Sequence, residues 1–224
     1  MQFKVIISTL AAGALAHIEM KWPAPRQSQF RPNPTFPVDY AQNSPLGIYP
    51  CKGHFEPGPA VASYRAGQHI DVELLGSANH NGGHCEFSLS YDNGRTFTTI
   101  TTILDSCLKG DARNYRVLLP PGAPPRDNVL FAWTWINTTG DREFYMNCAD
   151  IRITNPNPGR IEGHRPVIAN LPDCAERAKR LPIQYDARGC PFKDIDCPYI
   201  AEWTDFPNCS GHELFTSRPK VFFP

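Results

Sequence analysis

Turn-forming residues divide the chain into short segments from residue 67 onward, and this division constrains the fold more than any other feature. Three of the turns are NGG at residues 81–83, DNG at 92–94 and PPG at 120–122. The segments between the turns are rich in Val, Ile, Thr, Phe and Trp: HIDVELLGS, CEFSLSYD, FTTITTIL, NYRVLLP, VLFAWTWIN and ADIRITN. Short strands of this kind, with no helical stretch between them, predict an all-β fold, an antiparallel β-sandwich.

The regions on either side of these segments differ in composition. Residues 17–60 are rich in proline, which removes a backbone donor and fixes φ, so long helices are excluded there. The linker-like NPNPGRIEGHRP begins at Asn155. Residues 156–224 contain four cysteines, with DCAERAKRL as a candidate short helix capped by Asp173. So small a segment cannot bury enough apolar surface alone. We expect a disulfide-rich C-terminal extension, packed on the sandwich or tethered to it, with a separate binding module as the alternative.

Residues 1–16 have the pattern of a secretory signal peptide. Lys4 supplies a positive start, residues 5–15 are apolar, and Ala14-Leu15-Ala16 fits the small-x-small cleavage pattern. The apolar stretch is shorter than the roughly 20 residues of a membrane-spanning helix. Cleavage after Ala16 would make His17 the first residue, whereas a cut one or two residues away would leave His17 internal or remove it. We therefore predict a signal peptide at 1–16, a β-sandwich domain at 17–155 and the extension at 156–224.

Other features agree with a secreted, extracellular protein. The chain has eight cysteines, an even number that predicts disulfides in an oxidising compartment. Asn137 and Asn208 begin N-glycosylation sequons and are predicted glycan acceptors. The net charge is zero, and it is −1 without Lys4, with 22 acidic and 21 basic residues left. This balance, without a basic run, gives no support for binding nucleic acid or an anionic membrane.

Two histidines, His80 and His84, lie in GSANHNGGHCEF, where a glycine-rich loop leaves a predicted strand. Their spacing suits a helical metal site, but Gly82 and Gly83 disfavour a helix. On spacing alone, a loop histidine is more often exposed than a ligand. A chain that begins with His17 changes this balance, because one residue then offers an α-amine and a ring nitrogen. One further imidazole completes a three-nitrogen site, which suits Cu(II).

Four segments in order carry a resemblance to a known family: HIEMKWPAP, NSPLGIYPCKG, GSANHNGGHCEFSLS and FAWTWINTTGDREFYMNCADI. With a terminal histidine, they resemble the copper-dependent lytic polysaccharide monooxygenases of fungi, most closely auxiliary activity family 11. The resemblance runs from His17 to about Asn155 and does not include the tail. It implies an immunoglobulin or fibronectin III-like sandwich with long loops and a copper site on a rather flat face.

The resemblance also implies a set of site residues. His17 matches the N-terminal histidine and His80 the second histidine of a brace for one copper ion, and Tyr145 matches the axial tyrosine. Glu143 matches an acidic residue near the oxygen-binding face and would face the same side of a strand as Tyr145. Ala78 matches the small residue near the unused axial position. Without the resemblance, Tyr145 fits a packed strand aromatic and Glu143 a solvated strand residue.

Some cysteines gain roles from the same resemblance. Cys51 and Cys148 match family cysteines and would join the N-terminal segment to the strand that bears Tyr145. Cys85 and Cys107 would join the His80 loop to the region that follows it. Both disulfides would restrain segments that carry copper ligands. The four remaining cysteines would pair within the tail, in one of three connectivities.

The function that the resemblance implies is that of an oxidoreductase, a secreted copper-dependent monooxygenase that cleaves a crystalline polysaccharide, with chitin the expected substrate. Its partners would be the polysaccharide surface, an external electron donor, and peroxide or dioxygen. We expect a monomer with no nucleic-acid or membrane partner. One alternative is a secreted copper-binding protein with a histidine brace but no polysaccharide oxidation, and another is a metal-free carbohydrate-binding or structural sandwich. A hydrolase is disfavoured, since no pair of carboxylates marks one.

Overall fold

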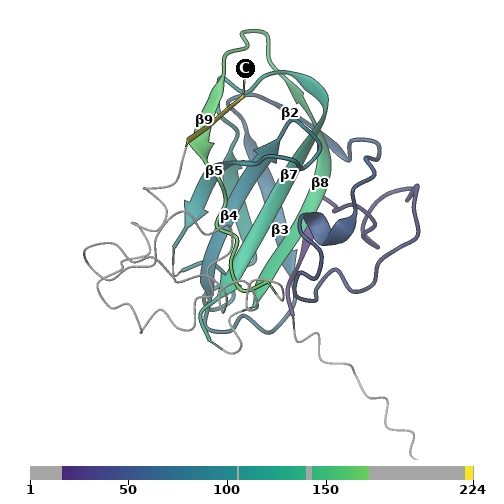
Figure 1. Ribbon diagram of the computed structural model, residues 1–224, viewed down its shortest axis with the longest axis vertical. Coiled ribbons are helices and arrows are strands. Elements are labelled where there is room, and N and C mark those ends of the chain that lie inside the picture. The colour runs from purple at the N-terminus through teal and green to yellow at the C-terminus, as the bar shows by residue number, and fades with distance from the viewer. Residues whose placement is uncertain (1–16, 105, 140–142, 172–219, 224) are drawn as a thin grey trace, which may run out of the picture.

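The protein consists of two β-sheets (Figure 1). The structure is a computed structural model, and it describes residues 17–104, 106–139, 143–171 and 220–223. The smaller sheet has the order β1-β3-β6, with β1 at Glu19–Trp22, β3 at His69–Leu75 and β6 at Asn114–Leu118. The larger has the order β10-β9-β5-β4-β7-β8-β2, with strands at Ala62–Arg65 (β2), Gly83–Ser90 (β4), Thr98–Ile103 (β5), Arg126–Asn137 (β7), Phe144–Thr154 (β8), Ile161–His164 (β9) and Lys220–Phe223 (β10).

The predicted all-β sandwich is confirmed. The described residues contain no α-helix, and their one helical element is the short 3-10 turn η1 at Cys51–Gly53. No helix in this part of the chain is long and apolar enough to cross a membrane. The strand pairs are antiparallel except for β2 and β8, which run parallel with Ala62 opposite Ile151.

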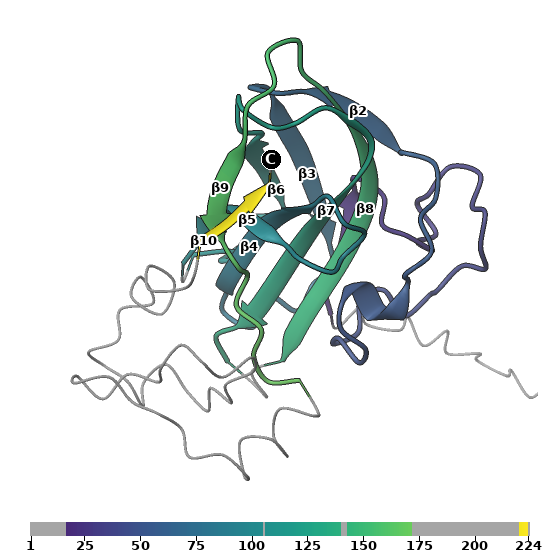
Figure 2. The ribbon, with the colours of Figure 1, turned by 45° about the horizontal axis from the view of Figure 1, so that its top comes forward.

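The sheet continues beyond residue 155, where the sequence suggested a linker. β9 pairs with β5 through His164 and Thr99, and β10 pairs with β9 (Figure 2). After β9, Val167 and Ala169 are buried on the outer face of the larger sheet. In the described residues the extension is therefore packed on the sandwich. The helix predicted at 173–181 and the four tail cysteines lie outside the described residues.

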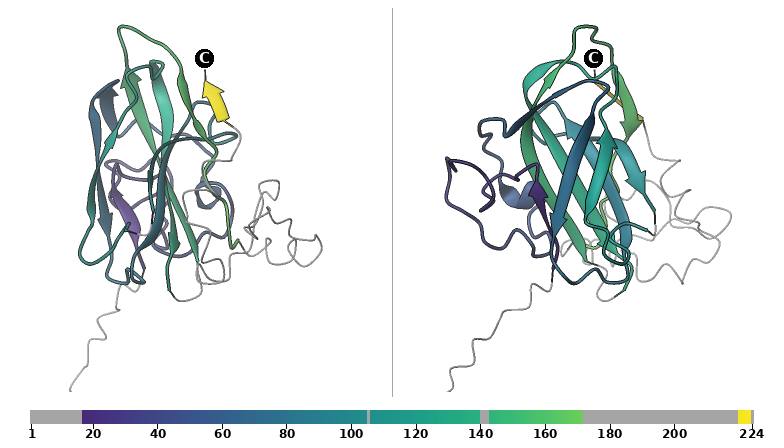
Figure 3. Two further views of the ribbon diagram at one scale, coloured as in Figure 1. Left: turned by 90° about the vertical axis from the view of Figure 1, so that its left-hand side faces the viewer. Right: turned by 180° about the vertical axis from the view of Figure 1, so that it is seen from behind.

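The main core lies between the two sheets, which Figure 3 shows from the side. β4 is buried along its whole length, as is β7 from Leu130 onward, because a second apolar layer covers the outer face of the larger sheet. That outer layer contains Leu46, Phe97, Phe144 and Met146 among others. β8 alternates between the two layers, so Tyr145 faces the inner core while its neighbours face outward.

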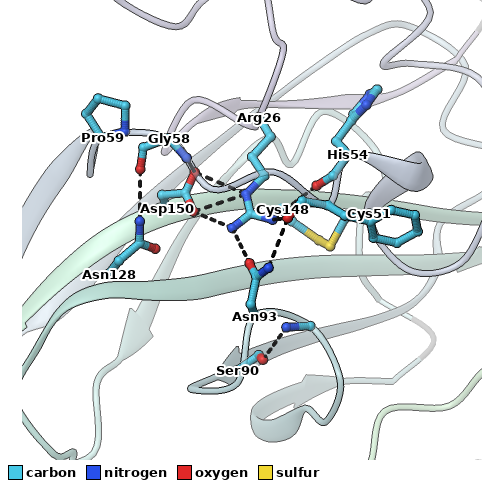
Figure 4. A network of polar contacts seen from close by, with 12 residues as sticks. Arg26, Cys51, His54, Gly58, Pro59, Ser90, Asn93, Asn128, Cys148 and Asp150 are labelled. Atoms are coloured by element: carbon cyan, nitrogen blue, oxygen red, sulfur yellow. Dashed lines mark hydrogen bonds and ion pairs between the residues drawn. A yellow bond between two sulfur atoms is a disulfide. The ribbon is translucent and has the colours of Figure 1, made fainter. Parts of the chain in front are cut away.

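The proline-rich segment before β2 covers the edge of β8, which would otherwise present unpaired backbone groups. The amides of Leu46, Arg26 and Val61 donate to the carbonyls of residues 144, 148 and 150. The Arg26 guanidinium also lies against Asp150, with 2.6 Å between Nη2 and Oδ1, and donates to Asn93 (Figure 4). This buried network fixes the N-terminal segment along β8.

Candidate metal centre

The predicted site residues lie at one end of the sandwich, where β3 ends and where β4 and β8 begin. His17 lies two residues before the start of β1, and Glu19 of β1 is opposite Leu75 at the end of β3. The loop from β3 to β4 contains Ala78 and His80. Because Gly83 at the start of β4 is opposite the end of β7, the turn into β8 is at this end too. Three segments far apart in sequence therefore meet here.

Gly76 lets the β3–β4 loop approach His17. Its φ is +139°, and a Cβ at this position would lie 1.9 Å from the His17 carbonyl oxygen. No side chain larger than hydrogen fits without displacing that carbonyl. The loop that carries Ala78 and His80 therefore begins in direct contact with the backbone of His17.

His80 is held in an unusual backbone conformation. Its φ is +46°, and the next residue, Asn81, has a φ of +60°. Such values cost free energy in residues other than glycine and persist only where the surroundings impose them. The backbone carbonyl of His80 accepts a hydrogen bond from the Thr139 amide at 3.2 Å, and its ring lies 5.9 Å from that of Trp135 between centroids.

The Nε2 atom of His80 is the clearest chemical signal of the site. It is buried and has no hydrogen-bond partner among the described residues. A buried polar atom without a partner costs free energy, so such atoms in folded proteins call for an explanation. A metal ion is one, because a neutral imidazole nitrogen is a common ligand.

Tyr145 joins the two histidines through its ring contacts. It is 1% exposed, with its ring centroid 4.8 Å from that of Trp135 and 6.1 Å from that of His17. The rings of His17, Tyr145, Trp135 and His80 are thus neighbours in that order. No motif marks Trp135 as a site residue, although it lies in the segment FAWTWINTTGDREFYMNCADI that carries the family resemblance.

The hydroxyl of Tyr145 donates a hydrogen bond to Oε2 of Glu143 at 2.5 Å. Burial raises the pKa of this phenol, and the hydrogen bond to Glu143 and the charge of that carboxylate raise it further. The phenol is therefore protonated at neutral pH. Glu143 itself lies just before β8 and is half-buried, so it is neither a strand residue nor fully solvated. Its carboxylate meets the Tyr145 hydroxyl, although Glu143 is not part of the strand from whose alternation the shared side was predicted.

The donors at this end fit a copper brace better than a conventional side-chain site. Among the described residues, no group of three His, Cys, Asp or Glu side chains could hold a metal ion. Two imidazoles and one terminal amine, in contrast, would need only His80 and a His17 whose amine cleavage has freed, and nitrogen ligands of this number suit Cu(II). The half-buried Ala78 lies between Gly76 and His80 in the same loop.

His84 does not share this site. It is buried in β4, with Nε2 3.8 Å from Oε1 of the buried Glu86. The His80–His84 spacing in the sequence thus does not mark a shared metal site.

Two disulfides restrain the segments around the site. Cys51 is bonded to Cys148, and Cys85 is bonded to Cys107, the pairs that the resemblance implied. The first fixes the N-terminal segment to β8, three residues from Tyr145. The second fixes the beginning of β4, close after the His80 loop.

One of the two predicted glycan acceptors is buried in the folded chain. Asn137 ends β7 with its side chain 0% exposed, so the folded chain gives a glycan no access to this amide. Asn208, the other predicted acceptor, lies outside the described residues.

The similar proteins that we report by sequence are all AA11 family lytic polysaccharide monooxygenases. The chain is 44% identical over 159 residues to AA11 family lytic polysaccharide monooxygenase A of Aspergillus fumigatus, a match that covers 67% of this chain and 71% of that protein. It is 28% identical to monooxygenase B of the same species and 31% identical to an AA11 enzyme of Aspergillus oryzae. These two matches cover 85% of this chain but 48% of each relative, so the chain spans about half their length.

Two further comparisons do not identify a family for this chain. No family model matches the chain. A crystal structure of a cellulose-active polysaccharide monooxygenase from M. thermophila is similar at a TM-score of 0.45 and 14% identity, covering 66% of this chain and 80% of that one. Similarity this low does not establish a shared fold.

Proposed function

This chain belongs to the AA11 family of lytic polysaccharide monooxygenases, whose members are copper-dependent oxidoreductases, and we propose that it is a secreted enzyme that cleaves chitin. The family follows from the identity to monooxygenase A over most of both chains. Chitin is proposed because it is the substrate class that the resemblance to this family implies. Secretion is proposed from the signal-peptide pattern of residues 1–16 and from the two disulfides.

The proposed copper ligands are the α-amine and ring of His17 and the ring of His80. The observation that carries this assignment is the buried Nε2 of His80, which has no hydrogen-bond partner among the described residues. The α-amine becomes available only if cleavage follows Ala16. Bound there, copper would supply the redox chemistry: electron uptake from an external donor and the activation of dioxygen or peroxide.

The roles proposed for the remaining residues follow from their contacts. Tyr145 would close one side of the site, because its buried phenol stays protonated and is held by Glu143. Glu143 would hold or deliver a proton on the side where oxygen binds, since its carboxylate is half-buried at the same end of the sandwich. Ala78 would leave space beside the metal, because it carries only a methyl group.

Product analysis tests this function. The mature protein, loaded with copper and given a reductant, should release oxidised oligosaccharides from crystalline chitin, detected by mass spectrometry. The same protein without reductant is the control and should release none. Copper binding without an oxidised product from chitin, cellulose or any other glycan tested would favour a copper-binding protein that does not oxidise polysaccharide. Oxidised products from cellulose alone would contradict chitin as the substrate but would support the proposed oxidative cleavage.

A further inference from the structure

Asn147 is a buried amide in β8 to which none of the roles above applies. Its side chain is 2% exposed, and it lies two residues after Tyr145. Successive side chains of a strand alternate between its faces, so Asn147 points toward the smaller sheet as Tyr145 does. A polar group at the inner face of a sandwich is costly unless it is fully hydrogen-bonded.

Both polar groups of the Asn147 side chain have partners. Its Oδ1 accepts a hydrogen bond from the backbone amide of Met20 at 2.7 Å. Its Nδ2 is 3.1 Å from each of three acceptors: the carbonyl oxygens of Gln42 and Met146, and Oε1 of the Gln42 side chain. Because Nδ2 faces acceptors only, the amide cannot rotate by half a turn, and its oxygen stays directed at Met20.

The bond to Met20 joins the two sheets close to the candidate metal centre. Met20 belongs to β1, three residues after His17, and β1 is an edge strand of the smaller sheet. Because its amide donates to Asn147, it points away from β3, toward the side on which the smaller sheet has no further strand. The side chain of Asn147 accepts the hydrogen bond that a neighbouring strand would otherwise accept. Met20 is only three residues from His17 along the chain, and Asn147 is only two residues from Tyr145.

We propose that Asn147 is a positioning residue for the copper site, which sets the place of His17 relative to Tyr145 by holding β1 against β8. The proposal rests on the copper brace of the proposed function. Other contacts near His17, such as that with Gly76, fix the first residue to the β3–β4 loop. Asn147 fixes it to the other side of the site.

The test compares two leucine variants in mature protein that begins at His17. Asn147→Leu removes the acceptor for Met20 at nearly constant volume. Asn155→Leu is the matched control, because Asn155 also donates to two carbonyls, those of Pro121 and Ala123 at 2.9 Å, but lies just past the opposite end of β8. The measurements are the dissociation constant for Cu(II), the electron paramagnetic resonance spectrum of the bound ion, and the unfolding midpoint of the copper-free protein.

We expect Asn147→Leu to raise the copper dissociation constant by about 10-fold to 100-fold and to change the spectrum. Asn155→Leu should lower the unfolding midpoint and leave the affinity and the spectrum unchanged. If the leucine variant does not fold, Asn147→Ser provides the same test, since its short hydroxyl does not reach the Met20 amide.

Two results would count against the inference in different ways. If the Asn147 variant that folds shows unchanged copper affinity and an unchanged spectrum, with only a lower unfolding midpoint, Asn147 has a structural role alone and the proposed function stays intact. Failure of the wild-type protein to bind one copper ion would overturn the proposed function and the inference together.

Discussion

At the scale of single residues, the contact between Gly76 and His17 gives a direct test of the site. Gly76→Ala places a methyl group where the His17 carbonyl now lies, 1.9 Å from the new Cβ. We predict that this variant binds copper about 10-fold more weakly or worse, because His17 must move. Copper titration of the mature protein measures the change.

Gly67→Ala is the matched control for this prediction. Gly67 also has a positive φ, +85°, but a Cβ there would meet nothing within 4 Å. Both variants should lose about 1–3 kcal/mol of unfolding free energy from backbone strain, and only Gly76→Ala should lose copper affinity. Equal copper binding in the two variants would show that the close approach does not position His17.

The sequence could identify the proposed ligands but not what holds them. The proposed ligands His17 and His80, like Glu143 and Tyr145 beside them, lie in segments that resemble the family one by one. The place of the Asn147 amide depends on the register between sheets that are joined by residues far apart in the chain. No spacing rule in the sequence encodes such a contact.

At the scale of elements, Glu86 of β4 attaches the start of the C-terminal extension to the larger sheet. Its side chain is 0% exposed, and Oε2 accepts the Val167 amide at 2.6 Å. Glu86→Ala should lower the free energy of unfolding by about 2 kcal/mol, because the Val167 amide is left without this acceptor. Hydrogen exchange at Val167 should become faster.

Glu86→Gln is the control, because its amide oxygen can still accept that hydrogen bond. We expect this variant to retain slower exchange at Val167 than the alanine variant. If the Val167 amide exchanged at the wild-type rate in Glu86→Ala, attachment through this carboxylate would be ruled out.

The strands were predicted with unequal success. The segments HIDVELLGS at 69–77 and FTTITTIL at 97–104 contain β3 and β5. Burial alternates along β3, because a half-buried strand keeps the period of two, but it does not alternate along β5. β9 has the sequence IEGH, which contains one large apolar residue and is indistinguishable from a linker. The parallel pairing of β2 with β8 was also unforeseen, since it joins distant segments and has no local signature.

At the scale of the whole molecule, buried tyrosines predict a loss of stability in alkali. Burial raises the pKa values of Tyr64, Tyr91, Tyr115 and Tyr145 above the usual value near 10. The folded state then keeps protons that the unfolded state releases. The stabilisation is complete below about pH 10 and is lost as the pH rises above it, by up to about 1.4 kcal/mol per pH unit for each tyrosine.

Urea unfolding between pH 8 and about pH 11 checks this dependence. The pKa of Lys52 is lowered, chiefly by burial, and its contribution has the opposite sign, but four tyrosines outweigh one lysine. Tyr91→Phe should make the decline less steep, because it removes one of the four groups. A free energy of unfolding that stayed constant up to pH 11 would refute the prediction.

The central claim is that cleavage before His17 creates a copper ligand, and one measurement tests it most directly. Copper titration should compare mature protein that begins at His17 with the same protein extended by Ala16. We predict tight binding of one copper ion to the first and a loss of affinity in the second, because the extended chain has no amine on His17 to bind the metal. Equally tight binding by the extended protein would contradict the brace.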